Sequence, residues 1–278
     1  MLLGKTSPRN MRARPHFLQE RCADSCNRFP WVTLFLVCTN IIVFYVADDP
    51  TRALAYRANG SPAQWGTAWS YAFFHVDAYH LWSNMIIFVL GGALLEATDT
   101  NGRLLVVSIC AVPCSALGHG IVYGDRVGVI GFSGVVYAVL AYQLALLVKN
   151  WREMRCRPNN PDPYIACRAC VSSAPVRIVI AIILLLGEIG FMQGATNVSR
   201  GGHGFGALSG VFVGLAIGSN VLLDWWELVI PVIGMLGQIS LSCAGFATRQ
   251  SAVGMYGLLA SLPIALYAAK ELRRWTTA

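Results

Sequence analysis

The sequence predicts an all-α membrane protein, and two observations carry that prediction. Of the 278 residues, 55% are hydrophobic and only 13% are charged, whereas a soluble globular domain carries about 25% charged residues. The apolar residues also fall in blocks of helical length instead of short alternating runs. A helix needs roughly 20 apolar residues to cross the hydrocarbon core of a bilayer, so each block is a candidate span.

The apolar blocks give eight expected spans, whose ends are defined to within a few residues. They cover residues 31–47, 80–98, 104–123, 131–149, 176–193, 202–222, 228–246 and 253–270. Glu188 interrupts the fifth span, which makes it the weakest of the eight. Pro231 and Pro263 lie in the last two spans, and membrane helices tolerate proline.

The distribution of Lys and Arg predicts the orientation of these spans. With the N-terminus in the cytosol, the spans alternate so that only five of the 21 basic residues lie on the opposite side: Arg52, Arg57, Arg126, Arg200 and Arg249. The net charge of +7 is therefore interpreted as membrane topology. No basic patch is interleaved with stacking aromatic residues, so nucleic acid is not an expected partner.

Three regions are expected along the chain. Residues 1–30 form a basic cytosolic tail, residues 31–222 a six-helix core, and residues 223–278 two additional transmembrane helices with a short basic tail. The partly apolar segment 48–79 is expected to be a long loop at the non-cytosolic interface. The Pro-rich segment 150–175 is expected to be an irregular cytosolic loop.

The nine cysteines do not indicate a disulfide framework. Four lie in apolar spans, where cysteine is usually a small buried hydrophobic residue: Cys38, Cys110, Cys114 and Cys243. Cys167-x-x-Cys170 could form half of a zinc site with Cys22 and Cys26. We favour free or lipidated thiols near the bilayer instead, and no metal or cofactor is expected.

Burying a polar residue inside a bilayer costs free energy, so polar residues within the spans indicate a functional site. His80 and Asn84 lie at the start of the second span, Ser133 at the start of the fourth and His203 at the start of the sixth. Because successive spans alternate in direction, all three starts lie on the non-cytosolic side. The four side chains can therefore meet at one depth.

These residue types together suit nucleophilic catalysis. Ser133 is a candidate nucleophile and His203 the base that takes its proton. The Asn84 amide, the His80 ring and the Ser133 backbone N–H could stabilise the oxyanion. Tyr137 lies one turn after Ser133 and could fix the orientation of the His203 ring.

Each of these residues also has a commonplace interpretation. A membrane Ser usually bonds to its own helix carbonyl, and a His or Asn often joins neighbouring helices. The string Gly131-Phe132-Ser133-Gly134 is not a soluble hydrolase elbow, because Val135 stands where that motif needs glycine. The conjunction of the residues at matched depth is what favours catalysis.

The motifs resemble those of the rhomboid intramembrane serine proteases. They are His80-x-x-x-Asn84, Gly92-x-x-x-Glu96, Gly131-Phe132-Ser133-Gly134-Val135-Val136-Tyr137 and His203-x-x-Gly206-x-x-x-Gly210. The resemblance implies a six-helix rhomboid-like transmembrane bundle, here with about two additional C-terminal helices. It also implies a Ser133–His203 dyad without an acid, oxyanion contacts from His80 and Asn84, support of the histidine by Tyr137 and a structural hydrogen-bonding role for Glu96.

The chain departs from the family pattern in its first loop and at its C-terminus. The family's Trp-Arg pair is missing from the first loop, although Trp65 lies one position away from the expected place. The C-terminal helix pair favours the secretory pathway or cell surface, whereas the basic N-terminal tail keeps the mitochondrial inner membrane open.

Glycines recur every four residues along the sixth span, at Gly206, Gly210, Gly214 and Gly218. Such stripes let two membrane helices approach closely. The fourth span offers small residues at Gly134 and Ala138, close to Ser133. We expect the two stripes to meet and hold His203 within reach of Ser133.

The favoured function is a serine endopeptidase that cuts transmembrane segments of membrane-protein substrates. Helix-breaking residues should mark the substrates, because an intact helix hides its carbonyls in hydrogen bonds. The alternative is a catalytically inactive rhomboid-like protein that binds membrane clients or serves quality control. A transporter is a third possibility, but no inverted repeat is evident.

Overall fold

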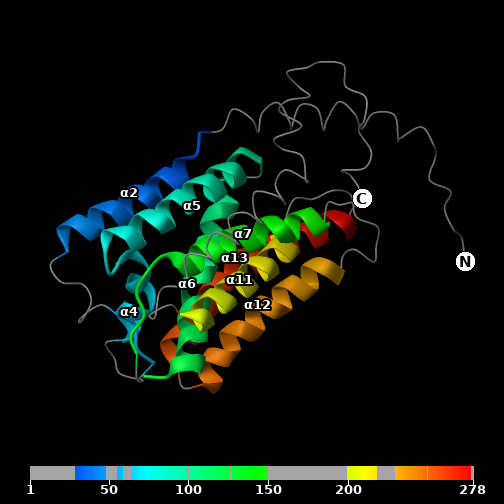
Figure 1. Ribbon diagram of the computed structural model, residues 1–278. Coiled ribbons are helices and arrows are strands. Elements are labelled where there is room, and N and C mark those ends of the chain that lie inside the picture. The colour runs from blue at the N-terminus through cyan, green and yellow to red at the C-terminus, as the bar shows by residue number, and fades with distance from the viewer. Residues whose placement is uncertain are drawn as a thin grey trace, which may run out of the picture.

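The computed structural model describes residues 29–47, 55–58, 64–98, 101–125, 127–149, 199–217, 229–248 and 250–276. Its elements, labelled as in Figure 1, are α2 (Trp31–Val46), α4 (Gln64–Ser70), the 3₁₀ turn η2 (Tyr71–Phe73), α5 (Ala78–Thr98), α6 (Asn101–Tyr123), α7 (Ser133–Lys149), α11 (Arg200–Ile217), α12 (Val229–Ala247) and α13 (Ser251–Thr276). In this part of the chain, extended backbone pairs only in an isolated bridge between Tyr56 and Val129. The predicted all-α bundle is confirmed.

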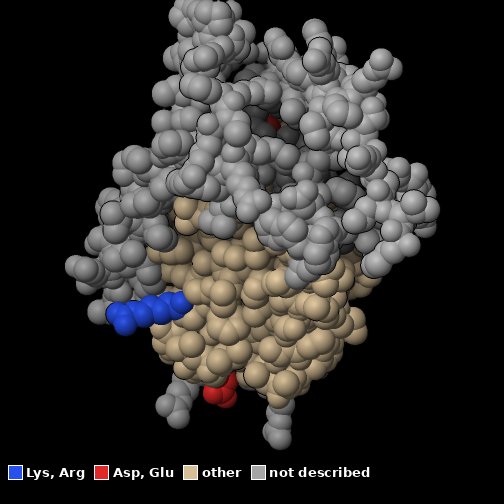
Figure 2. Space-filling view, turned by 90° about the vertical axis from the view of Figure 1, so that its right-hand side faces the viewer, with Lys and Arg blue, Asp and Glu red and all other residues tan. Residues whose placement is uncertain are grey.

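The helices have the composition of membrane spans. Three stretches are long and apolar enough to cross a bilayer, namely Ala78–Glu96, Asn101–Tyr123 and Ile230–Ala247, and three shorter helices are also apolar. Figure 2 shows a described surface with few charged side chains on the face it presents. Together with the length and apolar composition of the helices, this surface makes the protein an integral membrane protein. The predicted span 176–193, with Glu188, lies outside the described residues.

The segment expected as a loop over 48–79 contains helical elements in its described part. There α4 and η2 pack against the bundle, and Ala68, Tyr71 and Ala72 are buried. The Tyr71 hydroxyl donates a hydrogen bond to the Val112 carbonyl at 2.8 Å, and burial raises the pKa of Tyr71, which keeps it a neutral donor. The aromatic side chains of this segment therefore anchor it to α6.

Helix α2 is held against α5 by the motif Gly92-x-x-x-Glu96. The buried Glu96 carboxylate accepts hydrogen bonds from the backbone N–H groups of Val32 and Thr33, at 3.0 and 2.7 Å. These N–H groups belong to the first turn of α2. The N–H groups of a first turn have no hydrogen-bond acceptor within their own helix. A Cβ at Gly92 would lie 2.7 Å from the Thr33 hydroxyl, so only glycine allows this approach. The structural role that the resemblance implies for Glu96 agrees with this geometry.

Helix α11 packs between α6 and α7 at the centre of the bundle (Figure 1). A Cβ at Gly206 would overlap the Gly134 carbonyl oxygen, and a Cβ at Gly210 would overlap that of Ala138. On the side facing α6, Gly201 lies against the backbone of Gly118. Because these positions carry no bulk, the backbones of the three helices come into direct contact.

The two C-terminal helices join this centre through buried polar groups. The Gln238 side chain of α12 accepts from Ser209 of α11 at 3.1 Å and donates to the Cys114 sulfur of α6 at 3.3 Å. Next to the α12–α13 turn, Gln250 accepts from the Tyr56 hydroxyl at 2.8 Å. The additional helix pair is therefore bonded both to the core and to the segment around Tyr56.

Candidate functional site

Ser133 and His203 lie in direct contact where α7 and α11 begin. Ser133 is the first residue of α7, and His203 lies in the first turn of α11. The Ser133 hydroxyl oxygen is 2.6 Å from His203 Nε2, a hydrogen-bond distance. The two residues are 70 positions apart in the chain, and the close packing of α7 on α11 brings them together.

Tyr137 supports the His203 ring by stacking. The two ring centroids are 4.5 Å apart and the planes are inclined by only 14°. Tyr137 lies one turn after Ser133 on α7, so the same helix presents the hydroxyl and the ring that orients the histidine. His203 Nδ1 is buried and has no hydrogen-bond partner within the described part of the chain. Stacking on Tyr137 and the hydrogen bond with Ser133 are the contacts that orient the His203 ring in the described part of the chain.

His80 approaches the same site from the start of α5. Its ring lies against Gly131, where a Cβ would come within 2.6 Å of the ring carbon Cε1. Gly131 has φ of +125°, a conformation that glycine adopts readily, and it lies two residues before Ser133. The His80 ring also packs edge-on against His75, with centroids 5.0 Å apart. Burial and the neighbouring His80 lower the pKa of His75 to about 3, so His75 is neutral.

Asn84 lies one turn after His80 on α5 and is 1% exposed. Its side-chain nitrogen has no hydrogen-bond partner among the described residues. No hydrogen bond joins it to Ser133 or His203 in that part of the chain. A buried amide donor is normally satisfied, so this nitrogen is available to donate to an ordered water or to a bound group.

The arrangement contains the groups that nucleophilic acyl transfer requires. A serine hydroxyl becomes a competent nucleophile when an adjacent base takes its proton, and His203 Nε2 is in position to do so. The Ser133 backbone N–H lies at a helix N-terminus, where amide groups lack intrahelical partners. That amide, together with the Asn84 side chain, supplies donors of the kind that stabilise a developing oxyanion.

Sequence reasoning missed one buried residue near this pair, His119. It is 2% exposed and hydrogen-bonded through both ring nitrogens, to Ser199 and to the Val127 carbonyl. Residue spacing does not reveal these contacts, because one partner is distant in sequence and the other contributes only its backbone. The signal that could have singled it out is a histidine within an apolar span.

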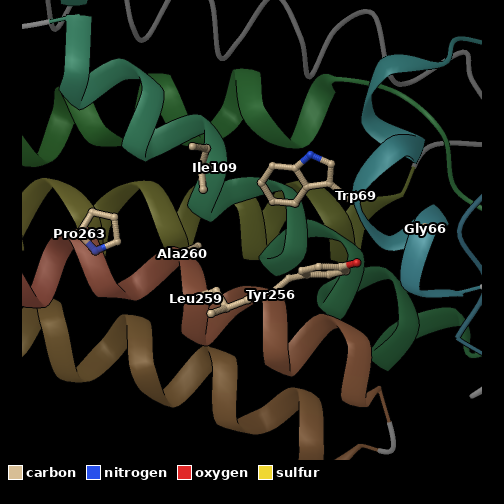
Figure 3. Close-up of a pocket in the computed structure, with 7 residues that line it drawn as sticks. All are labelled: Gly66, Trp69, Ile109, Tyr256, Leu259, Ala260 and Pro263. Atoms are coloured by element: carbon tan, nitrogen blue, oxygen red, sulfur yellow. The ribbon is translucent and has the colours of Figure 1, made fainter.

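An apolar pocket of about 580 Å³ lies away from this pair, between α4, α6 and α13 (Figure 3). Trp69 of α4 and Tyr256 of α13 line it, with ring centroids 6.0 Å apart. Ile109 and Leu259 complete its apolar wall. None of its lining residues belongs to the predicted site, so this pocket does not hold the reacting groups.

No group of three metal-ligating side chains occurs among the described residues. Cys22, Cys26, Cys167 and Cys170, which could form a zinc site, lie outside the described residues.

Comparisons with known proteins agree with the motifs. The chain is 26% identical over 183 residues to Rhomboid-related protein 1 of Caenorhabditis elegans. This match covers 62% of this chain and 46% of the relative. It is 33% identical over 89 residues to Rhomboid-related protein 3 of Homo sapiens. That match covers 32% of this chain and 22% of the relative. The chain thus matches less than half the length of each of these relatives. A family model, the Rhomboid domain, matches residues 62–220, which is more than half of the chain. The chain therefore belongs to the rhomboid family.

Proposed function

We propose that this protein is an intramembrane serine endopeptidase that cleaves transmembrane segments of other membrane proteins. One observation carries the proposal: the Ser133 hydroxyl lies 2.6 Å from His203 Nε2, within a bundle of apolar helices. Placing a polar serine and histidine within a membrane protein costs free energy. Nucleophilic acyl transfer is a function that requires such a hydrogen-bonded pair.

In this proposal the Ser133 oxygen attacks the scissile carbonyl carbon while His203 Nε2 accepts the hydroxyl proton. The negative charge on the former carbonyl oxygen is stabilised by the Asn84 amide, the His80 ring and the Ser133 backbone N–H. Collapse of the tetrahedral intermediate breaks the C–N bond, and His203 returns the proton to the leaving amine. Water then attacks the acyl-enzyme ester with the same assistance and releases the carboxylic acid product.

The unpaired Asn84 nitrogen supports this assignment, because an oxyanion would supply the acceptor that the amide lacks. The stacking of Tyr137 on His203 supports a positioning role for Tyr137. The alternative, an inactive client-binding relative, would have no need of a hydrogen-bonded serine and histidine. Both residues are present, which favours the protease.

We also propose a secretory-pathway or cell-surface membrane for the protein, with the mitochondrial inner membrane as the alternative. The additional α12–α13 pair supports this placement, and the basic bias of the cytosolic segments supports the orientation. A glycosylation acceptor sequence engineered into an extension of the segment 48–79 should be modified in microsomes. An unmodified loop would contradict the orientation or the compartment.

A fluorophosphonate probe tests the enzyme directly. The purified protein in detergent should be labelled covalently and should cleave a model transmembrane substrate, whereas Ser133→Ala should do neither. If the wild type is folded but neither reacts nor cleaves, or if Ser133→Ala still cleaves, the protease proposal is wrong.

A further inference from the structure

His119 lies outside the proposed dyad, near the end of α6, and contacts the segments that lead into both members of the dyad. Its Nε2 is 2.8 Å from the Val127 carbonyl oxygen, and its Nδ1 is 2.8 Å from the Ser199 hydroxyl oxygen. Its ring also packs on Tyr123, with centroids 5.0 Å apart. One buried imidazole thus joins two segments that are far apart in sequence.

The partners determine how this imidazole is protonated. A backbone carbonyl can only accept, so His119 Nε2 carries the proton and donates it to Val127. In the neutral ring Nδ1 then has a lone pair, which accepts the Ser199 hydroxyl proton. The Ser199 oxygen is left to accept the Gly202 N–H at 3.1 Å. Each donor in this series of hydrogen bonds therefore has one acceptor. The bonds are donated in one direction, from Gly202 through Ser199 and His119 to Val127.

The last of these bonds caps α11. Ser199 immediately precedes the helix, and a serine hydroxyl that accepts an N–H three residues later is a favoured N-cap. The His203 N–H donates to the Ser199 carbonyl at 3.0 Å, the first hydrogen bond of the helical ladder at that position. The placement of His203 thus depends directly on Ser199, which His119 holds.

The hydrogen bond from His119 to the Val127 carbonyl reaches the segment before Ser133. Val127 begins the stretch of backbone that continues through the Tyr56–Val129 bridge and Gly131 to Ser133. The Gly131 N–H donates to the Tyr71 carbonyl at 3.0 Å, so this stretch is bonded to the bundle at several points. His119 binds it at the end nearest α6.

We propose that His119 is a positioning residue that sets the separation of Ser133 and His203 by binding the segment ahead of each. The inference rests on the proposed function, since it assigns a role within that reaction. The backbones of Gly118 and Gly201 touch beside His119, so the end of α6 is fitted to the start of α11 at this point. Loss of the imidazole should weaken the coupling between the two segments at this point.

The test uses full-length protein in detergent with a model transmembrane substrate. His119→Leu removes both hydrogen bonds, and a displacement of about 1 Å at a reacting pair can lower the rate 10²-fold. We expect kcat to fall by 10- to 100-fold with KM unchanged, because the substrate-binding surface is not altered. His119→Gln should retain most of kcat, since one amide offers a donor and an acceptor like the neutral imidazole.

Two further variants make the result specific. Ser199→Ala should reproduce the loss, and combining it with His119→Leu should lower kcat no further, because both remove one hydrogen-bonded chain. Gln238→Leu is the control: it removes a buried polar side chain that also hydrogen-bonds two helices, but that bonds neither Ser199 nor Val127. It should lower thermal stability without lowering kcat of the folded fraction.

A wild-type kcat in folded His119→Leu would overturn the inference, as would an equal loss of kcat in the Gln238→Leu control. If His119→Leu does not fold, Ser199→Ala decides the question by the same criteria. Failure of the proposed function looks different, because the wild type itself would then show no cleavage. An active wild type with unaffected His119 and Ser199 variants contradicts only the positioning role.

Discussion

The contact between Gly206 and Gly134 should control the geometry of the Ser133–His203 pair. A Cβ at Gly206 would overlap the Gly134 carbonyl oxygen and come within 3.0 Å of its carbonyl carbon. All of these atoms belong to backbone, which cannot rotate out of the way as a side chain can. Gly206→Ala must therefore push α11 away from α7, next to the turn that carries His203.

The size of the effect follows from two distances. Relief of the overlap requires a displacement of about 1 Å, which would lengthen the present 2.6 Å hydrogen bond to about 3.6 Å, beyond hydrogen-bonding range. We expect Gly206→Ala to lower kcat by about 10²-fold. Gly206→Val should be at least as damaging, because its branches add more volume at the same contact.

Gly204→Ala is the matched control. It lies on the same helix, and a Cβ there would meet nothing within 4 Å. Both substitutions raise helix propensity by about 1 kcal/mol, so a difference between them reflects the contact. The assay is cleavage of a model transmembrane substrate, with thermal stability in detergent as the check on folding. Full activity in folded Gly206→Ala, or an equal loss in Gly204→Ala, would refute the reasoning.

Three further outcomes are expected. Ser133→Ala and His203→Ala should each lower kcat by several powers of ten, and the double variant should resemble either single one because the two residues act as a unit; additive losses in cleavage assays would contradict a dyad. Asn84→Ala should lower kcat by about 10²–10³-fold while KM changes little, as for the loss of one oxyanion donor, and unchanged turnover would mean that Asn84 only joins helices. Glu96→Ala should destabilise the protein by about 2–4 kcal/mol, because it leaves buried donors of α2 unpaired; Glu96→Gln should cost less in the same thermal unfolding experiment, and equal stability of all three proteins would contradict the capping role.

The sequence alone was sufficient for the family and for those spans that lie in the described part of the chain. A bilayer offers no partner for backbone polar groups, so membrane-crossing segments must be continuous apolar helices, and these are visible as blocks. The helices observed at Trp31–Val46, Asn101–Tyr123 and Val229–Ala247 begin and end within a few residues of the expected spans. The helical content of the segment 48–79 was not foreseen, because α4 and η2 are short and their packing on α6 depends on tertiary contacts.

The candidate residues were also visible in the sequence, for the same physical reason. Polar groups are rare in apolar spans, so Ser133, His203 and Asn84 stand out without any structure. The alternation of spans was enough to predict that they share one side of the membrane. Their catalytic roles remain predictions to be tested by the experiments above.

Only the tertiary structure decided how closely the helices approach and which distant groups touch. The glycine stripe of the sixth span predicted the face of α11 that meets α7, and the contacts of Gly206 with Gly134 and of Gly210 with Ala138 confirm it, but residue types and spacing do not give the separation of the two backbones. The rotation and separation of α7 and α11 are set by backbone contacts such as Gly206 against Gly134, and these give the 2.6 Å Ser133–His203 distance. The role of His119 belongs to the same class, because its partners are a hydroxyl 80 residues away and a backbone carbonyl. Residue types and spacing determine which groups are present in the membrane, whereas the close packing of helices determines which of them touch.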